Sequence, residues 1–372
     1  MRDLKILVVG GGVGGMSAAI SLSRSGHSVD LIDLDPDWKV SGAGITVTGP
    51  TLRAFKALGI FDQVKHLGAC TWASRFYTQE GHLIGENAAR ERHDEMNSTG
   101  GIMRPVLHGI LSRLARETCA DIRLGVSVEG VRQLGASTEV IFTDGVVARY
   151  DLVVGADGIF SKIRELLFPN APEPKFTGQG CWRIIAERPA GMDYSEMYVG
   201  EKLKAGLNPV SETQMYMFLL EHVPDNPRLE AKDFIPRLSG LMSKFGGKIG
   251  ELASQLSDES QINYRPLKTQ FLASPWHSGR TLLIGDAAHA TTPHLASGAG
   301  MAVEDALVLA EVIRTEATIE AAFAAYEKRR YERCRLVVET SVRIGELEMA
   351  GGSPAALQQL MSTASTALRA AI

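Results

Sequence analysis

The sequence predicts an α/β protein made of two interleaved sheet-based units followed by a helical C-terminal tail. Two observations lead to this class. Near the N-terminus, short and wholly apolar strand segments alternate with helical segments, as in parallel sheets that are covered by helices. Between residues 176 and 222, short runs of aromatic and β-branched residues are separated by Gly, Pro and Asn, which indicates an antiparallel sheet. Apolar strands of the first kind return after this region, so we expect the two units to interleave.

The composition is that of an ordinary globular protein. The 372 residues are 45% hydrophobic and 22% charged, with a net charge of −4, which favours about two domains and gives no electrostatic footprint for nucleic acid or an anionic membrane. No apolar run approaches the roughly 20 residues of a membrane span. The four cysteines are scattered, which argues against a disulfide framework or a metal site and favours a reducing cytoplasm.

The first element pair is a strand, Ile6–Val9, followed by a glycine turn and a helix. A second strand ends at Asp33. The missing side chains let the chain turn sharply and let backbone N–H groups and the helix N-terminus approach a pyrophosphate, while Asp33 is placed to accept the hydroxyls of an adenosine ribose. We therefore predict a dinucleotide-binding βαβ unit. The turn residues predicted to bind the ligand are Gly10, Gly12, Val13, Gly14 and Gly15.

Two further apolar strands end in carboxylates. Leu152–Val154 leads into Asp157-Gly158, and Leu282–Ile284 leads into Gly285-Asp286. Ser161 is expected to cap the helix that follows Asp157. A nicotinamide dinucleotide alone would need only the glycine turn. Three such strand ends therefore indicate one elongated ligand lying across the carboxyl edge of a parallel sheet.

With these three motifs in this order, the chain resembles the FAD-dependent aromatic hydroxylases, the single-component flavoprotein monooxygenases of the p-hydroxybenzoate hydroxylase type. The resemblance runs from residue 4 to about residue 330. It implies a Rossmann-like FAD-binding domain at residues 1–72, 98–175 and 268–330. A mixed or antiparallel substrate-binding sheet would occupy residues 73–97 and 176–267, and residues 331–372 would form the C-terminal helical segment.

The resemblance also assigns cofactor contacts. The glycine turn and Asp33 would hold the ADP half of FAD, and Arg104 would reach the phosphate and ribityl region. Asp157-Gly158 would serve both FAD and the transient nicotinamide cofactor, while Asp286 would bind the ribityl chain. The flavin would then lie against a helix N-terminus that stabilises negative charge on the reduced ring. The other residues expected at the flavin are Gly44 (in Ser41–Ile45), Gly285, Pro293, Gly298, Ala299 and Gly300.

The helix start departs from the family pattern, because Ser297 stands where relatives often have Gln. The implied activity is hydroxylation of a small aromatic or heteroaromatic compound by O₂ through a flavin C4a-hydroperoxide, with NADH or NADPH as co-substrate. Tyr216 and His294 are the candidate catalytic residues. The expected substrate contacts are Trp182, Tyr216, Phe218 and His294.

Several of these residues are also compatible with purely structural roles. Trp182 and Tyr216 also suit ordinary sheet packing, and His294 also suits a plain loop histidine. His289, beside the Gly285 turn, is expected to be structural. At the level of function, an FAD-dependent reductase or oxidase of the same fold, or a non-enzymatic flavin-binding redox sensor, remain as alternatives. We expect a cytoplasmic protein with no nucleic-acid or membrane partner, and the helical tail would suit a homodimer.

Overall fold

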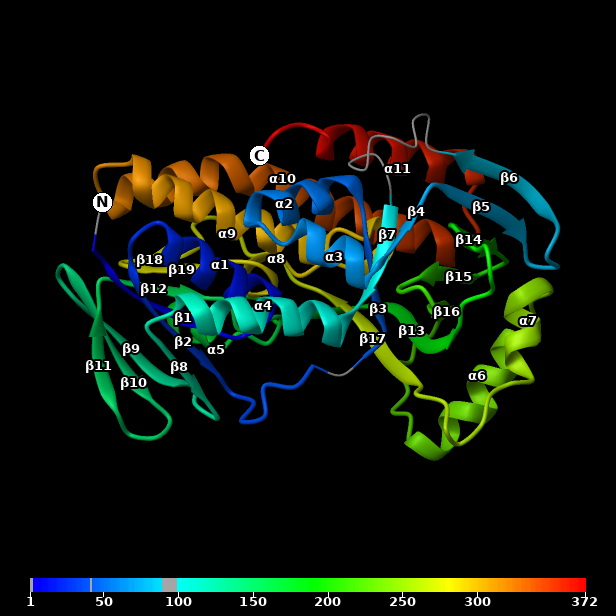
Figure 1. Cartoon of the computed structure of the whole chain (residues 1–372), viewed down its shortest axis with the longest axis horizontal. Coiled ribbons are helices and arrows are strands. Elements are labelled where there is room, and N and C mark those ends of the chain that lie inside the picture. The colour runs from blue at the N-terminus through cyan, green and yellow to red at the C-terminus, as the bar shows by residue number, and fades with distance from the viewer. Residues whose placement is uncertain (1–2, 41, 89–98) are drawn as a thin grey trace.

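The computed structural model describes residues 3–40, 42–88 and 99–372. Ser41, from the predicted Ser41–Ile45 segment, and residues 89–97 of the predicted substrate domain lie outside the described residues. The described chain forms two sheet-based halves that lie side by side, with one long helix running along both (Figure 1). We refer to them as the cofactor half and the substrate half.

A six-stranded sheet forms the centre of the cofactor half. Its strand order is β18-β19-β12-β1-β2-β8, and every neighbouring pair is parallel except the β18–β19 pair. The strands are β1 (Lys5–Val9), β2 (Ser28–Asp33), β8 (Asp121–Leu124), β12 (Leu152–Gly155), β18 (His277–Ser278) and β19 (Thr281–Leu283). Because β1, β12 and β19 are neighbours, the three predicted motifs follow strands that end along one edge of the sheet, as the sequence predicted.

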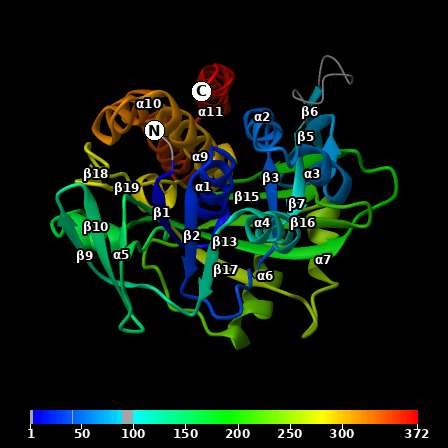
Figure 2. The same cartoon turned by 60° about the vertical axis from the view of Figure 1, so that its left-hand side comes forward.

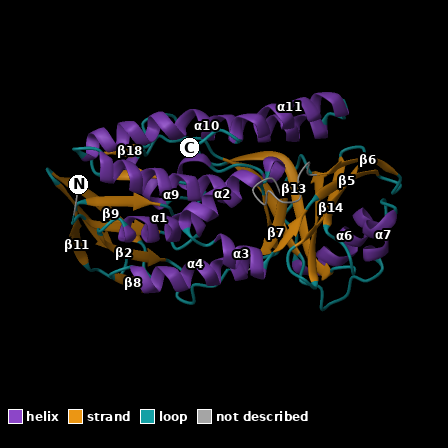
Figure 3. Ribbon diagram, turned by 45° about the horizontal axis from the view of Figure 1, so that its top comes forward, coloured by secondary structure: helices purple, strands orange, loops and turns teal. Residues whose placement is uncertain are grey.

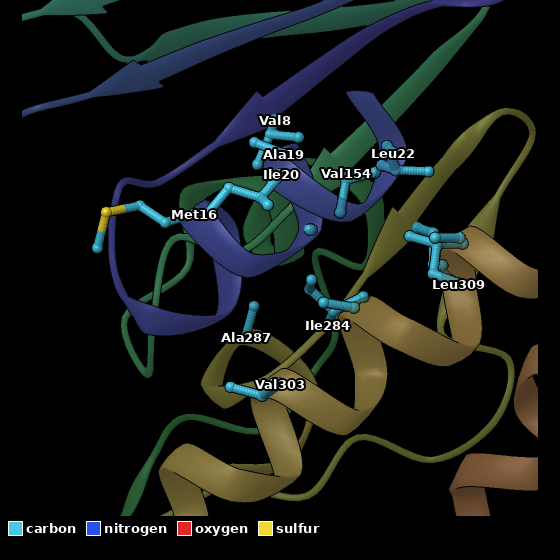
Figure 4. Close-up of a cluster of buried hydrophobic side chains, with 14 of the residues drawn as sticks. Val8, Met16, Ala19, Ile20, Leu22, Val154, Ile284, Ala287, Val303 and Leu309 are labelled. Atoms are coloured by element: carbon cyan, nitrogen blue, oxygen red, sulfur yellow. The ribbon is translucent and has the colours of Figure 1, made fainter. Parts of the chain in front are cut away.

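A layer of helices packs against this sheet. The helix α1 packs on α4 and on α9, and the apolar side chains of α1 and α9 meet those of the strands in one core (Figure 4). In that core Val8, Ile20, Ile284 and Val303 are completely buried. The helices of this half are α1 (Val13–Arg24), α2 (Gly49–Leu58), α3 (Phe61–Leu67), α4 (Arg104–Thr118), α5 (Lys162–Leu167), α8 (Asp286–His289), the 3₁₀ turn η3 (Pro293–Leu295) and α9 (Gly298–Thr315).

Two small sheets complete the cofactor half. One is the antiparallel meander β9–β10–β11, whose last strand is followed directly by β12. The other has the order β3-β7-β4 and adjoins the substrate half. Their strands are β9 (Val128–Leu134), β10 (Ser137–Phe142), β11 (Val147–Tyr150), β3 (Gly44–Val47), β4 (Ala69–Thr71) and β7 (Thr99–Met103).

A seven-stranded sheet forms the substrate half, with the order β17-β13-β16-β15-β14-β5-β6. All its pairs are antiparallel except β14–β5, so the predicted mixed or antiparallel sheet is confirmed. The strands are β5 (Ala73–Thr78), β6 (Leu83–Ala88), β13 (Lys175–Glu187), β14 (Tyr194–Val199), β15 (Leu203–Pro209), β16 (Gln214–His222) and β17 (Asn263–Thr269). Turning the molecule shows α6 and α7 against the outer face of this sheet (Figure 2); they follow the short 3₁₀ turn η2 (Ala231–Asp233). Their bounds are α6 (Phe234–Met242) and α7 (Gly247–Ala253).

The helix α10 (Ile319–Met349) connects the two halves mechanically. It packs on α9 at its start and contacts η3 and β13 further along, and α11 (Pro354–Leu368) follows it (Figure 3). Its 31 residues run unbroken through residue 330, where the sequence placed a domain boundary. Among the described helices, even this one has no apolar stretch suited to crossing a bilayer.

Candidate cofactor and substrate site

The glycine turn after β1 has the geometry that its sequence demands. Gly10 has φ +107°, and a Cβ there would lie 2.4 Å from the Ala156 carbonyl oxygen. A Cβ on Gly15 would lie 1.8 Å from the Gly10 carbonyl oxygen, so both positions require glycine. Gly12 is the N-cap of α1 and provides no side-chain cap, and a Cβ on it would meet only open space. The free N–H groups of α1 therefore face an accessible region, as a phosphate site requires.

Asp33 closes this turn from the second strand. Its carboxylate accepts the Gly11 N–H at 2.6 Å and the Asp35 N–H at 2.8 Å, one on each oxygen. The Trp38 indole N–H donates to the Gly11 carbonyl oxygen at 3.0 Å. Each Asp33 oxygen keeps a second lone pair, so the carboxylate can still accept ribose hydroxyls.

The carboxylate of Asp157 is largely occupied by hydrogen bonds within the protein. Its oxygens accept the Ser161 hydroxyl at 2.5 Å and the Ile163 N–H at 3.0 Å. Ser161 in turn accepts the Arg164 N–H at 2.9 Å, which confirms the predicted cap of α5. Burial raises the pKa of Asp157 despite these hydrogen bonds. Gly158 has φ +82°. The side chain of Asp157 therefore shapes this strand end, and a contact with a cofactor stays a prediction.

The turn at Gly285 rests on a buried ionic cluster. Asp305 of α9 accepts the Gly285 N–H at 2.8 Å, the Arg330 Nε–H at 2.7 Å, and lies 2.6 Å from the His289 Nε2. Burial opposes a charged His289, yet Cys334 and Asp305 outweigh it and hold the pKa of His289 well above its ordinary value. His289 is thus placed in a structural role, as the sequence suggested.

This cluster also brings His289, Asp305 and Cys334 within 4.8 Å of one another, a spacing compatible with a metal ion. Arg330 donates to Asp305 and, at 3.7 Å, to the Cys334 sulfur. The Arg330 Nη1 donates to the Glu304 carboxylate at 2.7 Å, and Arg333 donates to the same carboxylate. A guanidinium already supplies the cationic partner of these groups, so they serve as a support beneath the Gly285 turn.

Asp286 and Arg104 behave differently from this support. Both residues are exposed to solvent. Neighbouring protein atoms nevertheless raise the pKa of Asp286 and lower that of Arg104 by desolvation. Within the described residues neither side chain makes a hydrogen bond or ion pair, although each charge influences the other. Two opposite charges that are accessible and unpaired therefore lie near the carboxyl end of β19.

The N-terminus of α9 closes the same region. Its N-cap, Ser297, gives no side-chain cap, because the Ser297 hydroxyl donates instead to the Leu295 carbonyl oxygen at 2.7 Å. A Cβ on Gly300 would lie 2.2 Å from the Thr51 hydroxyl oxygen, so glycine allows α2 and α9 to approach. The first-turn N–H groups of α9, at Gly298, Ala299 and Gly300, are left for another partner.

The inner face of the substrate sheet carries Tyr216 and Phe218. Tyr216 hydrogen-bonds to the Thr46 hydroxyl, and the Asn208 amide donates to both oxygens at 3.2 Å. Burial raises the pKa of Tyr216. Phe218 is only partly buried beside Tyr216. A Cβ on Gly44 would lie 2.5 Å from the Tyr216 ring, so the predicted flavin-lining strand β3 packs directly against this tyrosine.

Trp182 lies on the opposite face of the sheet. It is completely buried, packs against Phe234 and Tyr264, and donates its indole N–H to Glu221 at 2.8 Å. The structure therefore does not bring Trp182 together with Tyr216, and ordinary sheet packing describes its contacts. His294 is withdrawn from solvent as well: its side chain is 1% exposed and faces α10.

Sequence reasoning missed four contributors to the site. Asp305 and Arg330 support the Gly285 turn, and Thr46 and Asn208 surround the Tyr216 hydroxyl. A signal existed for the first pair, because acidic "VED" in one apolar helix and basic "KRR" in the next suggest a buried interhelical ion pair. No signal existed for Thr46 and Asn208, since polar strand residues usually face solvent.

Comparisons with known proteins give a consistent result. A family described as FAD binding domain matches residues 3–341. Aurachin C monooxygenase/isomerase of Stigmatella aurantiaca is 31% identical, over 92% of this chain and 89% of that protein. The 2-heptyl-3-hydroxy-4(1H)-quinolone synthase of Pseudomonas aeruginosa is 27% identical, over 92% of this chain and 89% of its own. The structure of Klebsiella pneumoniae HpxO with FAD and uric acid superposes with a TM-score of 0.86 at 26% identity, covering 98% and 92% of the two chains.

Proposed function

The chain belongs to the FAD-binding family of aromatic-ring monooxygenases, and from this premise we propose how its site selects and holds a substrate. The enzyme is an FAD-dependent hydroxylase, which uses NAD(P)H and O₂. The proposed substrate is a planar nitrogen heterocycle that carries a ring carbonyl or hydroxyl group. The observation that carries the proposal is a group of charges: the unpaired, accessible Arg104 and Asp286 lie within electrostatic reach of each other, and Arg104 is also within reach of Tyr216 and Arg183 on the inner face of the substrate sheet.

The residues present fit FAD. Gly12 and the free N-terminus of α1 suit the pyrophosphate, and Asp33 suits the adenosine ribose. Arg104 and Asp286 offer a cation and an acceptor that lack protein partners in the described chain, as a polyhydroxylated chain with a nearby phosphate requires. When bound, FAD supplies the redox chemistry with NAD(P)H and O₂. The protein binds it, orients the ring and excludes water.

A count of hydrogen-bond donors supports the substrate class. The Asn208 amide donates to the oxygens of both Thr46 and Tyr216, and one hydroxyl proton is shared between those two oxygens. The other hydroxyl proton has no acceptor in the described structure. A ring oxygen of the substrate would accept it, because a donor left without an acceptor in a closed site costs about 1–3 kcal/mol.

Arg183 adds charge selectivity. It pairs in register with Phe218 on the same face of the sheet, is partly exposed, and makes no hydrogen bond or ion pair with another described residue. Its charge acts on both Arg104 and Tyr216. Such a face favours an electron-rich or anionic ring. The names of the relatives agree, since urate and a 4(1H)-quinolone both combine ring nitrogen with a ring oxygen substituent.

In this proposal Tyr216 and Phe218 touch the ring, and Pro293 lies at the flavin. His294 supports the loop that carries Pro293 without touching the ring. Asp157-Gly158 binds the nicotinamide cofactor transiently. A cytoplasmic location suits a reaction that needs NAD(P)H, and four free cysteines agree with it. A homodimer also remains our proposal; one relative is known in a tetrameric form.

The test is NADH and NADPH oxidation by FAD-loaded protein across urate, hydroxypyridines and 4-quinolones, with peroxide and ¹⁸O-labelled product measured. A hydroxylase gives one ring class whose addition accelerates oxidation, keeps peroxide low and incorporates one ¹⁸O atom. Fast oxidation that yields only peroxide would identify an oxidase instead. Oxidation that no ring accelerates, with FAD tightly bound, would favour the reductase or redox-sensor alternatives.

A further inference from the structure

The last turn of α10 reaches the loop that carries His294. One oxygen of Glu348 accepts a hydrogen bond from the Lys204 ammonium at 2.8 Å, and the other lies 3.3 Å from the His294 Nε2. On the other side of the ring, the His294 Nδ1 lies 2.8 Å from the Thr292 hydroxyl oxygen. A single carboxylate therefore joins strand β15 of the substrate sheet to the loop beside the predicted flavin position.

These groups are withdrawn from solvent. The Lys204 and Glu348 side chains are both 12% exposed, and the His294 side chain is 1% exposed. Burial alone would raise the pKa of Glu348, but Lys204 and His294 outweigh it and lower the pKa to about 2. Glu348 is therefore charged at neutral pH, in surroundings where its field on His294 is only weakly screened.

The buried atoms around His294 have few partners other than one another. The His294 Nε2 and the second Glu348 oxygen are buried 3.3 Å apart, and neither has another partner among the described residues. The buried Gln179 amide oxygen also has no hydrogen-bond partner among the described residues. Because buried polar groups are normally satisfied, a proton on Nε2 would pair the first two atoms with each other. A Cβ on Gly345 would lie 2.7 Å from the Gln179 oxygen and 3.2 Å from the His294 Nε2, so glycine permits α10 to come this close.

A small cavity adjoins these atoms. It measures about 90 Å³, enough for ordered water, and its lining includes Lys175, Gln179, Thr269, His294, Gly345 and Glu346. The charged groups around His294 are thus Glu348 on α10, which pairs with Lys204 on β15, and Glu346 on α10 and Lys175 on β13, which line the same cavity. Glu348 is the one that lies within 4 Å of the ring.

We propose that Glu348 is a positioning residue for the hydroxylase, which holds His294 with its proton on Nε2 so that Nδ1 accepts the Thr292 hydroxyl proton. This arrangement fixes the loop beside the flavin and shares its support with β15, the strand that also carries Asn208. The proposal rests on the proposed function, because it takes the loop at Pro293 as one wall of the flavin site. A carboxylate that orients an imidazole through its far nitrogen is a general device of histidine chemistry.

The first measurement reads the tautomer directly. Full-length, FAD-loaded protein labelled with ¹⁵N-histidine is compared by NMR with Glu348→Gln, and the His294 signals are assigned with a His294→Gln variant. We expect the Nε2–H tautomer in the wild-type protein and its loss or mixing in Glu348→Gln. Glu332→Gln is the matched control, because Glu332 lies on the same helix in an exposed pair with Arg335 and does not line the cavity beside His294. An unchanged His294 tautomer in Glu348→Gln would overturn the proposal.

The second measurement reads function and separates this inference from the proposed function. Product formed per NAD(P)H consumed is followed across pH with whichever heterocycle from urate, hydroxypyridines and 4-quinolones couples best. We expect Glu348→Gln to lower coupled turnover by about 10- to 100-fold and alter its pH profile, while FAD affinity stays within about twofold. A lowered rate with an unaltered pH profile would assign Glu348 a merely structural role and overturn the proposal.

If Glu348→Gln does not fold, the Lys204→Met/Glu348→Met variant replaces the buried pair by apolar side chains, a change that folds tolerate well. Loss of the Nε2–H tautomer in that variant supports the proposal, and its retention overturns it. A wild-type protein without FAD binding would sink the proposed function, yet the tautomer comparison would still decide the role of Glu348.

Discussion

Two carboxylates on either side of the Gly285 turn show opposite uses of charge. Beneath the turn, Asp305 is completely buried and receives hydrogen bonds from Gly285 and Arg330, with His289 at 2.6 Å. Above it, Asp286 is exposed and is unpaired within the described chain. The charges below the turn stabilise it, whereas Asp286 above the turn remains available to a ligand. Pairing within the protein therefore distinguishes scaffold from site better than residue type does.

The largest effect is expected when the lower region is broken. Asp305→Ala leaves the Arg330 guanidinium buried with one partner fewer and frees the Gly285 N–H, so the free energy of unfolding should fall by about 3–5 kcal/mol. Urea unfolding of the FAD-free protein measures this. Glu346→Gln, in an exposed pair, should change it by less than about 0.5 kcal/mol. Equal effects of the two variants would contradict the comparison.

Occupying the upper region should stabilise the protein. FAD at 100 times its dissociation constant adds about 2.7 kcal/mol to the free energy of unfolding, because it binds only the folded chain. Arg104→Met should lose most of this gain at the same FAD concentration, while its FAD-free stability stays within about 1 kcal/mol of wild type. Calorimetry with and without FAD measures both. A full FAD gain in Arg104→Met would remove Arg104 from the cofactor site.

Substitution of Asp286 should change the free energy of unfolding in the opposite direction to substitution of Asp305. Its pKa is raised in the folded protein by burial, so its ionisation destabilises the FAD-free fold, and this loss grows as pH rises above the unfolded value of 3.8. Asp286→Asn should therefore raise FAD-free stability at pH 7 slightly, because solvent screens this exposed side chain, and should flatten the pH dependence, while FAD binds more weakly. Paired unfolding and FAD titrations at pH 5 and pH 7 measure this; lower stability in the variant would show that Asp286 supports the fold.

The smallest effect on stability is expected at the substrate sheet. Its outer face carries residues that pack within the protein, and its inner face carries residues proposed to contact the substrate. Tyr216→Phe removes one hydroxyl and should cost about 1 kcal/mol of stability, yet it should sharply lower the product formed per NAD(P)H. Trp182→Phe removes the hydrogen bond to Glu221 on the outer face and should leave that ratio unchanged. Measuring peroxide and product together checks both. A loss of coupling in Trp182→Phe would mean that the two faces are not functionally distinct.

The sequence predicted correctly those features that depend on local backbone geometry. Close backbone approaches force glycine at Gly10 and Gly15, and Asp286 follows an apolar strand, so both motifs predicted strand ends that the structure brings to one edge of the sheet. Trp182 and Tyr216 could not be sorted in the same way. Both faces of their sheet are covered, one by α6 and α7 and the other by the cofactor half, so alternation did not reveal which of the two residues faces the cofactor half.

The other contacts that the sequence did not predict join residues that are far apart in the chain. Glu348 lies 54 residues beyond His294 in the sequence, at the far end of one helix, and its contact depends on where that helix crosses the sheet. Asp305 and Arg330 likewise meet only because α9 and α10 pack together. Helical periodicity gives the face that a residue occupies, but it does not give the neighbour that this face meets.

The unbroken α10 has a consequence for motion. At about 1.5 Å per residue, its 31 residues make a rod of roughly 46 Å that is bound to α9 near one end and to Lys204 near the other. Because one helix is attached to both halves, we do not expect them to open and close as two hinged domains. We expect substrate and product to pass by local rearrangement of loops and side chains instead.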